Sequence, residues 1–359
     1  MRLLVLCGFD RTSTFSYHTA WPRHLAADPH FQCTIVNLLD RGLFARLRAI
    51  AAVRAGRFDV VALLHSVFSN GRLLDGQLFD LVRAAPQPKV YFIGNEYKLM
   101  PEKMAFCEQL DVALLISQSS SPVIHRLYHE RLGCPVTGIP NTGLDTALFA
   151  PKTPRAGRPI DLGYRADDSP AYLGHRERRD MAEFFTQAAP RLGLTVDVSL
   201  DPAHRLAEQA WAAFLNRCKG QLGTEAGGDY FELDDRTRVA VNAFTAVHPS
   251  VPFGDLFDRF FRAYREAVPL RIMSGRNVEA AGTKTVQLLF EGHYDGYFAP
   301  DEHYISLKKD FSNADEAIAK FRDESFCQRL IDNAYHLAVE SLTYPKLIDR
   351  FRTALGDLL

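Results

Sequence analysis

Short apolar runs alternate with stretches of helical periodicity through the first part of the chain. Each run is rich in Val, Leu and Ile and is followed by a polar or glycine-containing turn, as strands buried on both faces require. This alternation predicts a parallel sheet wrapped by crossover helices. We expect strands at Leu3–Cys7, Thr34–Leu38, Val60–His65, Val90–Ile93 and Val112–Ile116, and helices that include Thr19–Ala27, Leu43–Ala55, Leu74–Ala84 and Pro122–Leu132.

The periodicity stops between Ile139 and Gly157, where three prolines mark a linker between domains. The α/β alternation then resumes, and the stretch from Asn313 onward is almost entirely helical. The pattern predicts two Rossmann-like domains, at 1–150 and 151–335, that face each other across a cleft, and a helix at 336–359 that crosses back to the first domain. In the second half we expect strands at Pro159–Tyr164, Thr195–Ser199, Gln221–Thr224, Val286–Phe290 and Tyr304–Leu307, and helices at Arg176–Leu192 and His204–Arg217.

Composition narrows the range of partners. The 359 residues carry a formal net charge of −1, and their Lys and Arg are scattered, so nucleic acid is not an expected partner. The six cysteines lie far apart without a CxxC pair and are expected to be reduced. No apolar run is long enough to span a bilayer and no signal peptide is evident, which favours the cytoplasm. Peripheral association with a membrane is compatible with this interpretation.

A carboxylate directly follows one predicted strand. Glu291 and Gly292 come immediately after the apolar run VQLLF. Ligands of open parallel sheets bind beyond the carboxyl ends of the strands. A carboxylate there can accept hydrogen bonds from the two hydroxyls of a ribose, and glycine leaves room for the ligand. The structural alternative is that Glu291 caps a neighbouring helix.

Two sets of motifs carry a resemblance to a known family. The segment Pro140–Pro151, PNTGLDTALFAP, resembles the linker that closes the first domain of GT-B glycosyltransferases. DLGYRA, YLGHRERR, FLNRCKGQLGTEAG and the segment from Gly275 to Asn313 then follow in one order. Together they resemble the bacterial surface-polysaccharide and spore-coat glycosyltransferases of the CgeB-like kind, over about half of the chain.

The resemblance implies a GT-B fold and transfer of a sugar from a nucleotide-sugar donor to an acceptor hydroxyl, in the synthesis of bacterial surface glycans or glycoconjugates. The acceptor would be a saccharide, a lipid-linked molecule or a protein. No cofactor is implied, because the nucleotide sugar is a substrate. GT-B enzymes generally balance the leaving phosphates with hydrogen-bond donors and cations, so no metal is expected.

These implications select candidate donor-binding residues in the second domain. The cations closest to strand ends are Arg165 and Arg276, and the alternative for each is a solvated surface arginine. Small and hydroxyl-bearing residues surround Arg276 and could hold a diphosphate. Besides Glu291 and Gly292, the candidates of this region are Arg165, Arg276, Asn277, Glu279, Thr283, Lys284 and Thr285.

Three more residues in this half are candidates. Glu225 lies in LGTEAGG, and in the resembled family an acidic residue at this strand end faces the sugar. It could bind sugar hydroxyls, stabilise an oxocarbenium-like centre or act as a nucleophile, and the structural alternative is a helix cap. His303 and Tyr304 could contact the donor phosphate or base, although a lone histidine is more often structural.

In the first domain the acceptor should meet loops that follow the strands. Asp10, His18 and Glu96 are the candidate bases if the reaction inverts the anomeric centre. None has a partner that the sequence identifies.

The sequence lacks two motifs found in known glycosyltransferases, and three other functions are alternatives. The spacing Glu-x7-Glu of many retaining GT-B enzymes is absent, because Gln287 and Ala299 occupy the second position, and the stereochemistry stays open. No Asp-x-Asp occurs, which disfavours a metal-dependent GT-A mechanism.

The alternatives are a sugar-nucleotide epimerase of the same architecture and an inactive glycan- or nucleotide-binding paralogue. A dinucleotide-dependent oxidoreductase is least favoured, because neither domain begins with G-x-G-x-x-G.

Overall fold

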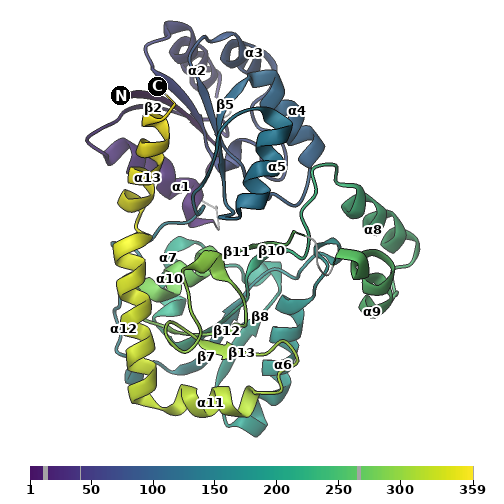
Figure 1. The fold of residues 1–359 in the computed structure, drawn as a ribbon. Helices are drawn as coiled ribbons and strands as arrows, with labels where there is room; N and C mark the ends of the chain where they lie inside the picture. Colours follow the sequence, from purple (N-terminus) through teal and green to yellow (C-terminus); the bar gives the residue numbers. More distant parts are fainter. Residues whose placement is uncertain (11–14, 41, 265–267, 359) are drawn as a thin grey trace. The chain divides into compact units, whose positions relative to one another are not determined.

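The computed structural model describes all of the chain except residues 11–14, 41, 265–267 and 359. The chain divides into two compact units. The first unit contains residues 1–141, 231–236 and 344–359, and the second contains residues 142–230 and 237–343. Each unit is built around its own parallel sheet (Figure 1), and the prediction of two Rossmann-like domains is confirmed.

The first unit has a six-stranded sheet in the order β2-β1-β3-β4-β5-β6, and every neighbouring pair is parallel. Its strands are β1 (Arg2–Cys7), β2 (Gln32–Asn37), β3 (Val60–Leu63), β4 (Lys89–Phe92), β5 (Val112–Ser117) and β6 (Val136–Gly138). Its helices are α1 (Ser16–Ala27), α2 (Leu43–Ala55), α3 (Gly76–Ala84), α4 (Met100–Leu110), α5 (Pro122–Leu132) and α13 (Tyr344–Gly356), with a 3-10 turn at His65–Val67.

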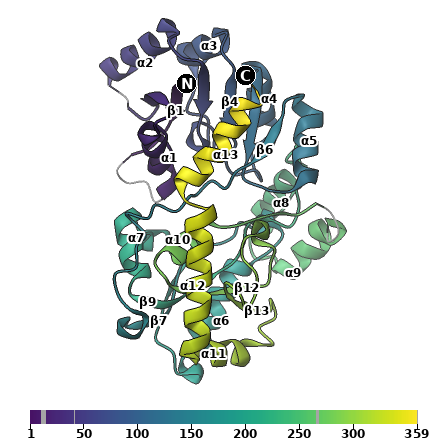
Figure 2. The same cartoon turned by 60° about the vertical axis from the view of Figure 1, so that its left-hand side comes forward.

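The last helix, α13, completes the core of the first unit. Leu347, Ile348 and Phe351 are buried among side chains of β1, β3 and β4, and α13 also packs beside α1 (Figure 2). A face of this parallel sheet needs a cover, and the final segment of the chain supplies it. The predicted return of the C-terminus is confirmed, although it begins at Tyr344 and not at 336.

The second unit has a five-stranded parallel sheet in the order β13-β12-β9-β7-β8 and a small two-stranded antiparallel sheet. The strands of the large sheet are β7 (Ile160–Arg165), β8 (Val196–Ser199), β9 (Cys218–Gly223), β12 (Val286–Phe290) and β13 (Ile305–Leu307), and those of the small sheet are β10 (Ala226–Gly228) and β11 (Leu270–Ile272). Its main helices are α6 (Glu177–Leu192), α7 (Glu208–Leu215), α10 (Gly275–Gly282), α11 (Ala314–Arg322) and α12 (Glu324–Ser341). Between β10 and β11 in the sequence lie α8 (Arg236–Val247), α9 (Phe253–Leu256), a π-helical turn at Phe257–Phe261 and a 3-10 turn at Arg262–Tyr264. Short 3-10 turns lie at Arg155–Gly157, Ala171–Leu173, Pro202–His204 and Tyr294–Gly296.

Both domain boundaries in the structure differ from those predicted from the sequence. The first unit ends at Asn141 and not at 150, because Leu144 and Phe149 are buried in the core of the second unit. The Leu144 N–H also donates to the carbonyl of Leu342. The predicted boundary at 335 falls inside α12, which continues to Ser341 in the second unit. The linker motif is therefore part of the packing of the second unit.

Candidate functional site

The carboxyl ends of the parallel strands gather at one edge of the second unit's sheet, where ligands of such folds bind. The strands β7, β9 and β12 end there, and α6 follows β7 from the same edge. Residues 283–285 alone separate α10 from β12, so α10 runs antiparallel to that strand and also begins at the carboxyl edge. Two helix N-termini, whose first backbone N–H groups have no carbonyl partner within the helix, therefore belong to this edge.

Two arginines without partners lie at these helix starts. Arg178 is the second residue of α6 and Arg276 is the second residue of α10, and both side chains are half-buried. Neither forms a hydrogen bond or ion pair with any described residue. Burial, followed by the positive charge of Arg178, lowers the pKa of Arg276. Two neighbouring cations that share helix N-termini form an environment that favours a bound anion.

Two other cations near this edge, Arg271 and Lys309, are neutralised by carboxylates in an ionic cluster. Arg271 donates to both carboxylate oxygens of Glu177, at 2.9 and 3.0 Å, and also pairs with Asp229. Lys309 lies 2.8 Å from Glu177. Although burial opposes ionisation of Glu177, the charges of Arg271, His175 and Lys309 hold its pKa at about 2. The cluster therefore keeps its own charges balanced and has little charge left for a ligand.

The other arginines of the region are paired as well. Arg165 binds Asp197 at 2.6 Å and stacks over the Phe214 ring, so the predicted donor cation is engaged within the sheet. Arg176 and Arg179 form ion pairs with Asp180 and Asp168.

Sequence reasoning did not single out Arg178, although one signal was present. Arg176 and Arg179 have acidic residues four positions later, whereas Arg178 has Ala182 there and Met181 three positions later. Its neighbours on the helix therefore leave Arg178 without a pairing partner.

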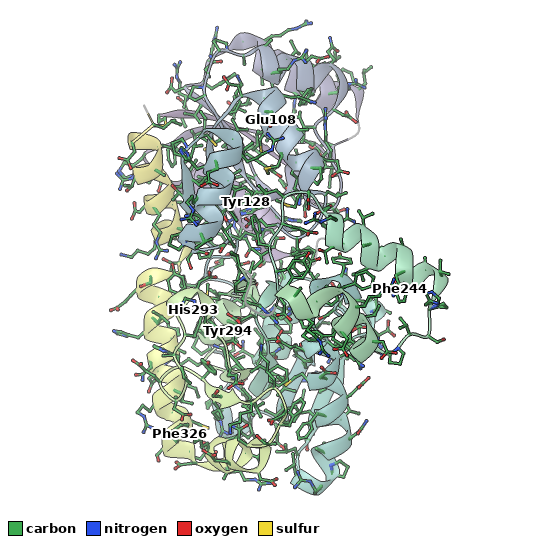
Figure 3. All side chains as sticks on the ribbon, turned by 45° about the vertical axis from the view of Figure 1, so that its right-hand side comes forward. Glu108, Tyr128, Phe244, His293, Tyr294 and Phe326 are labelled. Atoms are coloured by element: carbon green, nitrogen blue, oxygen red, sulfur yellow. The ribbon has the colours of Figure 1, made fainter. Side chains whose placement is uncertain are left out.

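Glu225 organises the loop that follows β12. One of its oxygens accepts the backbone N–H groups of His293 and Tyr294 at 3.0 and 2.7 Å. Figure 3 labels these two residues. Burial raises the pKa of Glu225, and these two hydrogen bonds offset part of the rise. A β-carbon on Gly292 would lie 2.6 Å from the other oxygen, so the glycine makes room for Glu225 and not for a ligand. The adjacent Glu291 is exposed, and its carboxylate makes no hydrogen bond or ion pair with the described residues.

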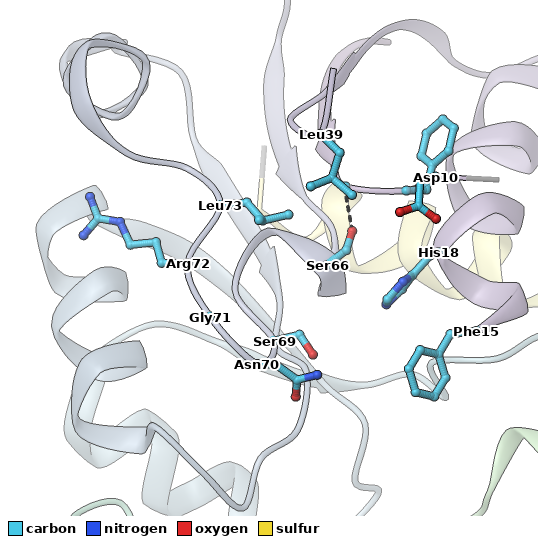
Figure 4. Close-up of a pocket in the computed structure, with 12 residues that line it drawn as sticks. Asp10, Phe15, His18, Leu39, Ser66, Ser69, Asn70, Gly71, Arg72 and Leu73 are labelled. Carbon is cyan, nitrogen blue, oxygen red and sulfur yellow. Dashed lines mark hydrogen bonds between the residues drawn. The ribbon is translucent and has the colours of Figure 1, made fainter. Parts of the chain in front are cut away.

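The first unit has a pocket of about 400 Å³ beyond the ends of β1 and β3 (Figure 4). Asp10 and His18 line one side, and Ser66, Ser69 and Asn70 line another. Burial lowers the pKa of His18 to about 4, although the charge of Asp10 opposes the change. At neutral pH the imidazole is therefore uncharged beside a carboxylate, in the state that a proton acceptor requires.

The architecture of this chain resembles that of several solved structures. No family model and no curated protein matches the chain. Among solved structures, HepE of Anabaena with UDP-glucose matches at TM-score 0.54 and 12% identity, over 99% of this chain and 100% of that one. Sucrose-phosphate synthase of Thermosynechococcus elongatus matches at TM-score 0.55 and 10% identity, over 99% and 98%. A DNA-modifying β-glucosyltransferase matches at TM-score 0.55 and 9% identity, over 99% and 100%.

The chain has the GT-B fold. The predicted resemblance to GT-B glycosyltransferases is confirmed at the level of the fold, and the closer resemblance to CgeB-like enzymes stays a prediction. Within this GT-B chain, no described helix combines the length and apolarity that crossing a membrane requires.

Several predicted donor residues of the GT-B chain instead serve its internal structure. Asn277 accepts the Ser274 N–H and donates to Gln287 at 3.0 Å, so its side chain caps α10 and joins that helix to β12. Glu279 is buried and accepts the Trp211 indole N–H at 2.7 Å. These contacts direct both side chains into the packing between elements and away from a ligand.

Three further predicted residues lie at the opposite edge of the sheet. Thr283, Lys284 and Thr285 follow α10 and precede β12, so they are at its amino end and cannot share a diphosphate with Arg276. Arg158 is buried and donates to the Thr285 hydroxyl and the Thr283 carbonyl, both at 2.8 Å. Lys284 lies 3.0 Å from Asp332. The structure therefore does not bring this trio together with Arg276, because about 12 Å of helix α10 separates it from the carboxyl edge.

His303 and Tyr304 also lie at the amino edge, because they precede β13, which is parallel to β12. The Nδ1 atom of His303 accepts the Ala299 N–H at 3.1 Å, and burial lowers the pKa of the ring. Tyr304 is buried with its ring centre 5.2 Å from that of Tyr294. His303 therefore serves the internal structure. The Tyr304 hydroxyl interacts with the Gly292 backbone and with the charge of Glu225, beyond the end of β12, and its contact with the donor stays a prediction.

Glu96, the third candidate base, is the centre of a buried network in the first unit. It accepts hydrogen bonds from the Ser117 hydroxyl, the Gln118 N–H and the Tyr128 hydroxyl, at 2.7 to 2.8 Å. Burial raises the pKa of Glu96, and these three donors offset part of the rise. A carboxylate engaged by three internal donors joins β5 to α5 and is not placed to accept a proton from a substrate.

Proposed function

We propose that this GT-B chain is a glycosyltransferase that transfers a sugar from a nucleotide donor to an acceptor hydroxyl. The observation that carries the proposal is the pair Arg178 and Arg276, two unpaired cations at the helix starts of the second unit's carboxyl edge. A nucleoside diphosphate is an anion of the right kind for two guanidinium groups and free backbone N–H groups.

The chemistry requires stabilisation of the leaving group. The acceptor oxygen forms a bond to the anomeric carbon, the bond from that carbon to the diphosphate oxygen breaks, and the hydroxyl proton passes to a base. Negative charge grows on the diphosphate during this step, and Arg178 and Arg276 offset it with fixed positive charge. We therefore propose that transfer needs neither a metal ion nor a cofactor.

The first donor to test is a UDP-sugar, because the structures of HepE and of the DNA-modifying β-glucosyltransferase were solved with uridine nucleotides or their sugars. Glu291, exposed and unpaired at the end of β12, would accept the two ribose hydroxyls. Glu225 would act as a positioning residue, because it fixes the loop that begins at Glu291.

The pocket of the first unit is the proposed acceptor site. Its hydroxyl and amide groups, from Ser66, Ser69 and Asn70, suit the hydroxyls of a saccharide portion. His18 would take the proton, with Asp10 stabilising the imidazolium that forms. The acceptor would be a saccharide, a lipid-linked molecule or a protein.

Donor hydrolysis and transfer test the proposal. Purified protein is incubated with UDP-glucose, UDP-galactose and UDP-N-acetylglucosamine, with and without oligosaccharide acceptors and with EDTA present throughout. UDP release that rises when an acceptor is added, and that the H18A variant loses, would support glycosyl transfer. Sugar interconversion without UDP release would instead identify an epimerase, and tight UDP binding without any turnover would identify an inactive binding paralogue.

A further inference from the structure

Helix α2 of the first unit presents an apolar face to solvent. Leu43, Phe44 and Leu47 are 70%, 82% and 52% exposed, whereas Ala49, Ile50 and Val53 of the same helix are buried. The remaining large exposed apolar side chains of the described chain are scattered. Scattered exposure is normal for a protein surface, but three large side chains within two turns of one helix mark a contact site.

Positive charge surrounds this face. Residues 42–58 contain Arg46, Arg48, Arg54 and Arg57 and no acidic residue, although the chain as a whole has a net charge of −1. None of the four arginines has an ion-pair partner among the described residues. Arg48 follows Phe44 by four residues, so it lies beside this exposed apolar side chain on the helix surface, and Arg54 lies two turns beyond Leu47.

We propose that α2 docks the protein on an anionic membrane surface, with Leu43, Phe44 and Leu47 among the acyl chains and the four arginines on lipid phosphates. An interfacial helix needs this division, because large apolar side chains enter the boundary region while long basic side chains extend to the headgroups. The occupant must be anionic to match four unpaired arginines. A second copy of this face would bring like charges together, which disfavours self-association through α2.

Vesicle binding of the full chain tests the proposal. We expect co-sedimentation with vesicles of phosphatidylcholine and phosphatidylglycerol, little with phosphatidylcholine alone, and release at high salt. Changing Phe44 and Leu47 together to Ser should weaken binding by about tenfold or more. The matched control is V247S, because Val247 is 74% exposed on α8, outside this face. R48Q/R54Q should weaken binding to the anionic vesicles, whereas R83Q/R126Q, on α3 and α5, should not.

Three results would overturn the proposal. The first is wild-type protein that ignores anionic vesicles, and the second is a loss on V247S equal to that on F44S/L47S. The third is a larger species in solution that F44S/L47S converts to monomer without any vesicle binding, which would assign the face to a second copy of the chain. Circular dichroism of each variant establishes that the fold is intact, so that lost binding reports on the surface. The readout does not involve nucleotide or sugar and is independent of the proposed transferase activity.

Discussion

Two arginines of the second unit, Arg158 and Arg276, show opposite uses of the same side chain. Arg158 lies at the amino edge of the sheet, 2% exposed, and donates to the oxygens of Thr153, Leu215, Cys218, Thr283 and Thr285. Arg276 lies at the carboxyl edge and has no hydrogen-bonding or ion-pair partner within the part of the chain that the structure describes. Burial lowers the pKa of both arginines, to about 10 for Arg158.

The difference separates a structural cation from a binding cation. A buried guanidinium whose donors are satisfied joins the elements around it, and its removal leaves several oxygens unsatisfied. A half-buried guanidinium without partners, next to a second cation, destabilises the free protein and is retained where a ligand supplies the missing anion. Stability measurements test the structural role of Arg158, and binding measurements test the ligand-binding role of Arg276.

The largest effect is expected on the free energy of unfolding when Arg158, the structural arginine, is replaced. Replacing Arg158 with Met should lower the free energy of unfolding by about 3 kcal/mol, because the buried oxygens of Thr283, Thr285 and Cys218 lose their donor. R276M should remain within about 1 kcal/mol of wild type. Urea unfolding of both variants measures the difference, with R191M, an exposed arginine paired with Asp315, as the control. Equal losses for R158M and R276M would erase the contrast.

The next effect concerns the paired cluster around Glu177. Its folded pKa of about 2 lies below the ordinary value of 4.5, so its contribution to stability is present above pH 4.5 and is lost as the pH falls towards 2. Between these values the wild type should lose roughly 3 kcal/mol more of its unfolding free energy than E177Q does. Unfolding measured across this pH range tests the sign, and E183Q, on the same helix, should follow the wild type.

A smaller effect is expected on binding at the carboxyl edge. R276A should weaken UDP binding by about thirtyfold, because one charge-assisted contact to the diphosphate is lost. Isothermal titration calorimetry measures the change. R179A is the control, since Arg179 is adjacent to Arg178 on α6 but pairs with Asp168. A comparable loss in R179A would show that general charge, and not a specific pair, attracts the nucleotide.

The smallest effect is expected at the amino edge. K284A should change UDP affinity by less than about twofold, because Lys284 pairs with Asp332 on the far side of α10 from the helix start. Calorimetry under the same conditions decides the point. A tenfold loss of UDP affinity in K284A would instead place the diphosphate near Thr283–Thr285, as the sequence predicts.

The sheets could be predicted because their strands carry a strong apolar signal. Val286–Phe290 and the helices Leu43–Ala55 and Pro122–Leu132 were predicted with the bounds that the structure shows. The strands β6, β10 and β11, each three residues long, were not predicted, although the equally short β13 was. Interruption of the pattern located the linker, but the unit to which Leu144 and Phe149 belong depends on tertiary packing.

The site could be predicted only in part. The rule that ligands gather at strand ends selected Glu291, and Arg276 also lies at the carboxyl edge. The rule does not support Thr283–Thr285, because these residues follow α10 and precede β12 at the amino edge of the sheet. The pairing of cations could not be predicted, since Arg271 finds Glu177 94 residues away in the sequence. Which arginine remains unpaired is a property of the folded chain.

Calorimetric comparison of UDP with uridine tests the central claim most directly. Uridine lacks the diphosphate, so the ratio of its Kd to that of UDP reports the contacts that the diphosphate makes. The wild type and R179A should bind UDP at least about a hundredfold more tightly than uridine, and R178A/R276A should reduce that ratio to a few fold. A double variant that keeps the full preference for UDP would contradict the assignment of Arg178 and Arg276 as the diphosphate site.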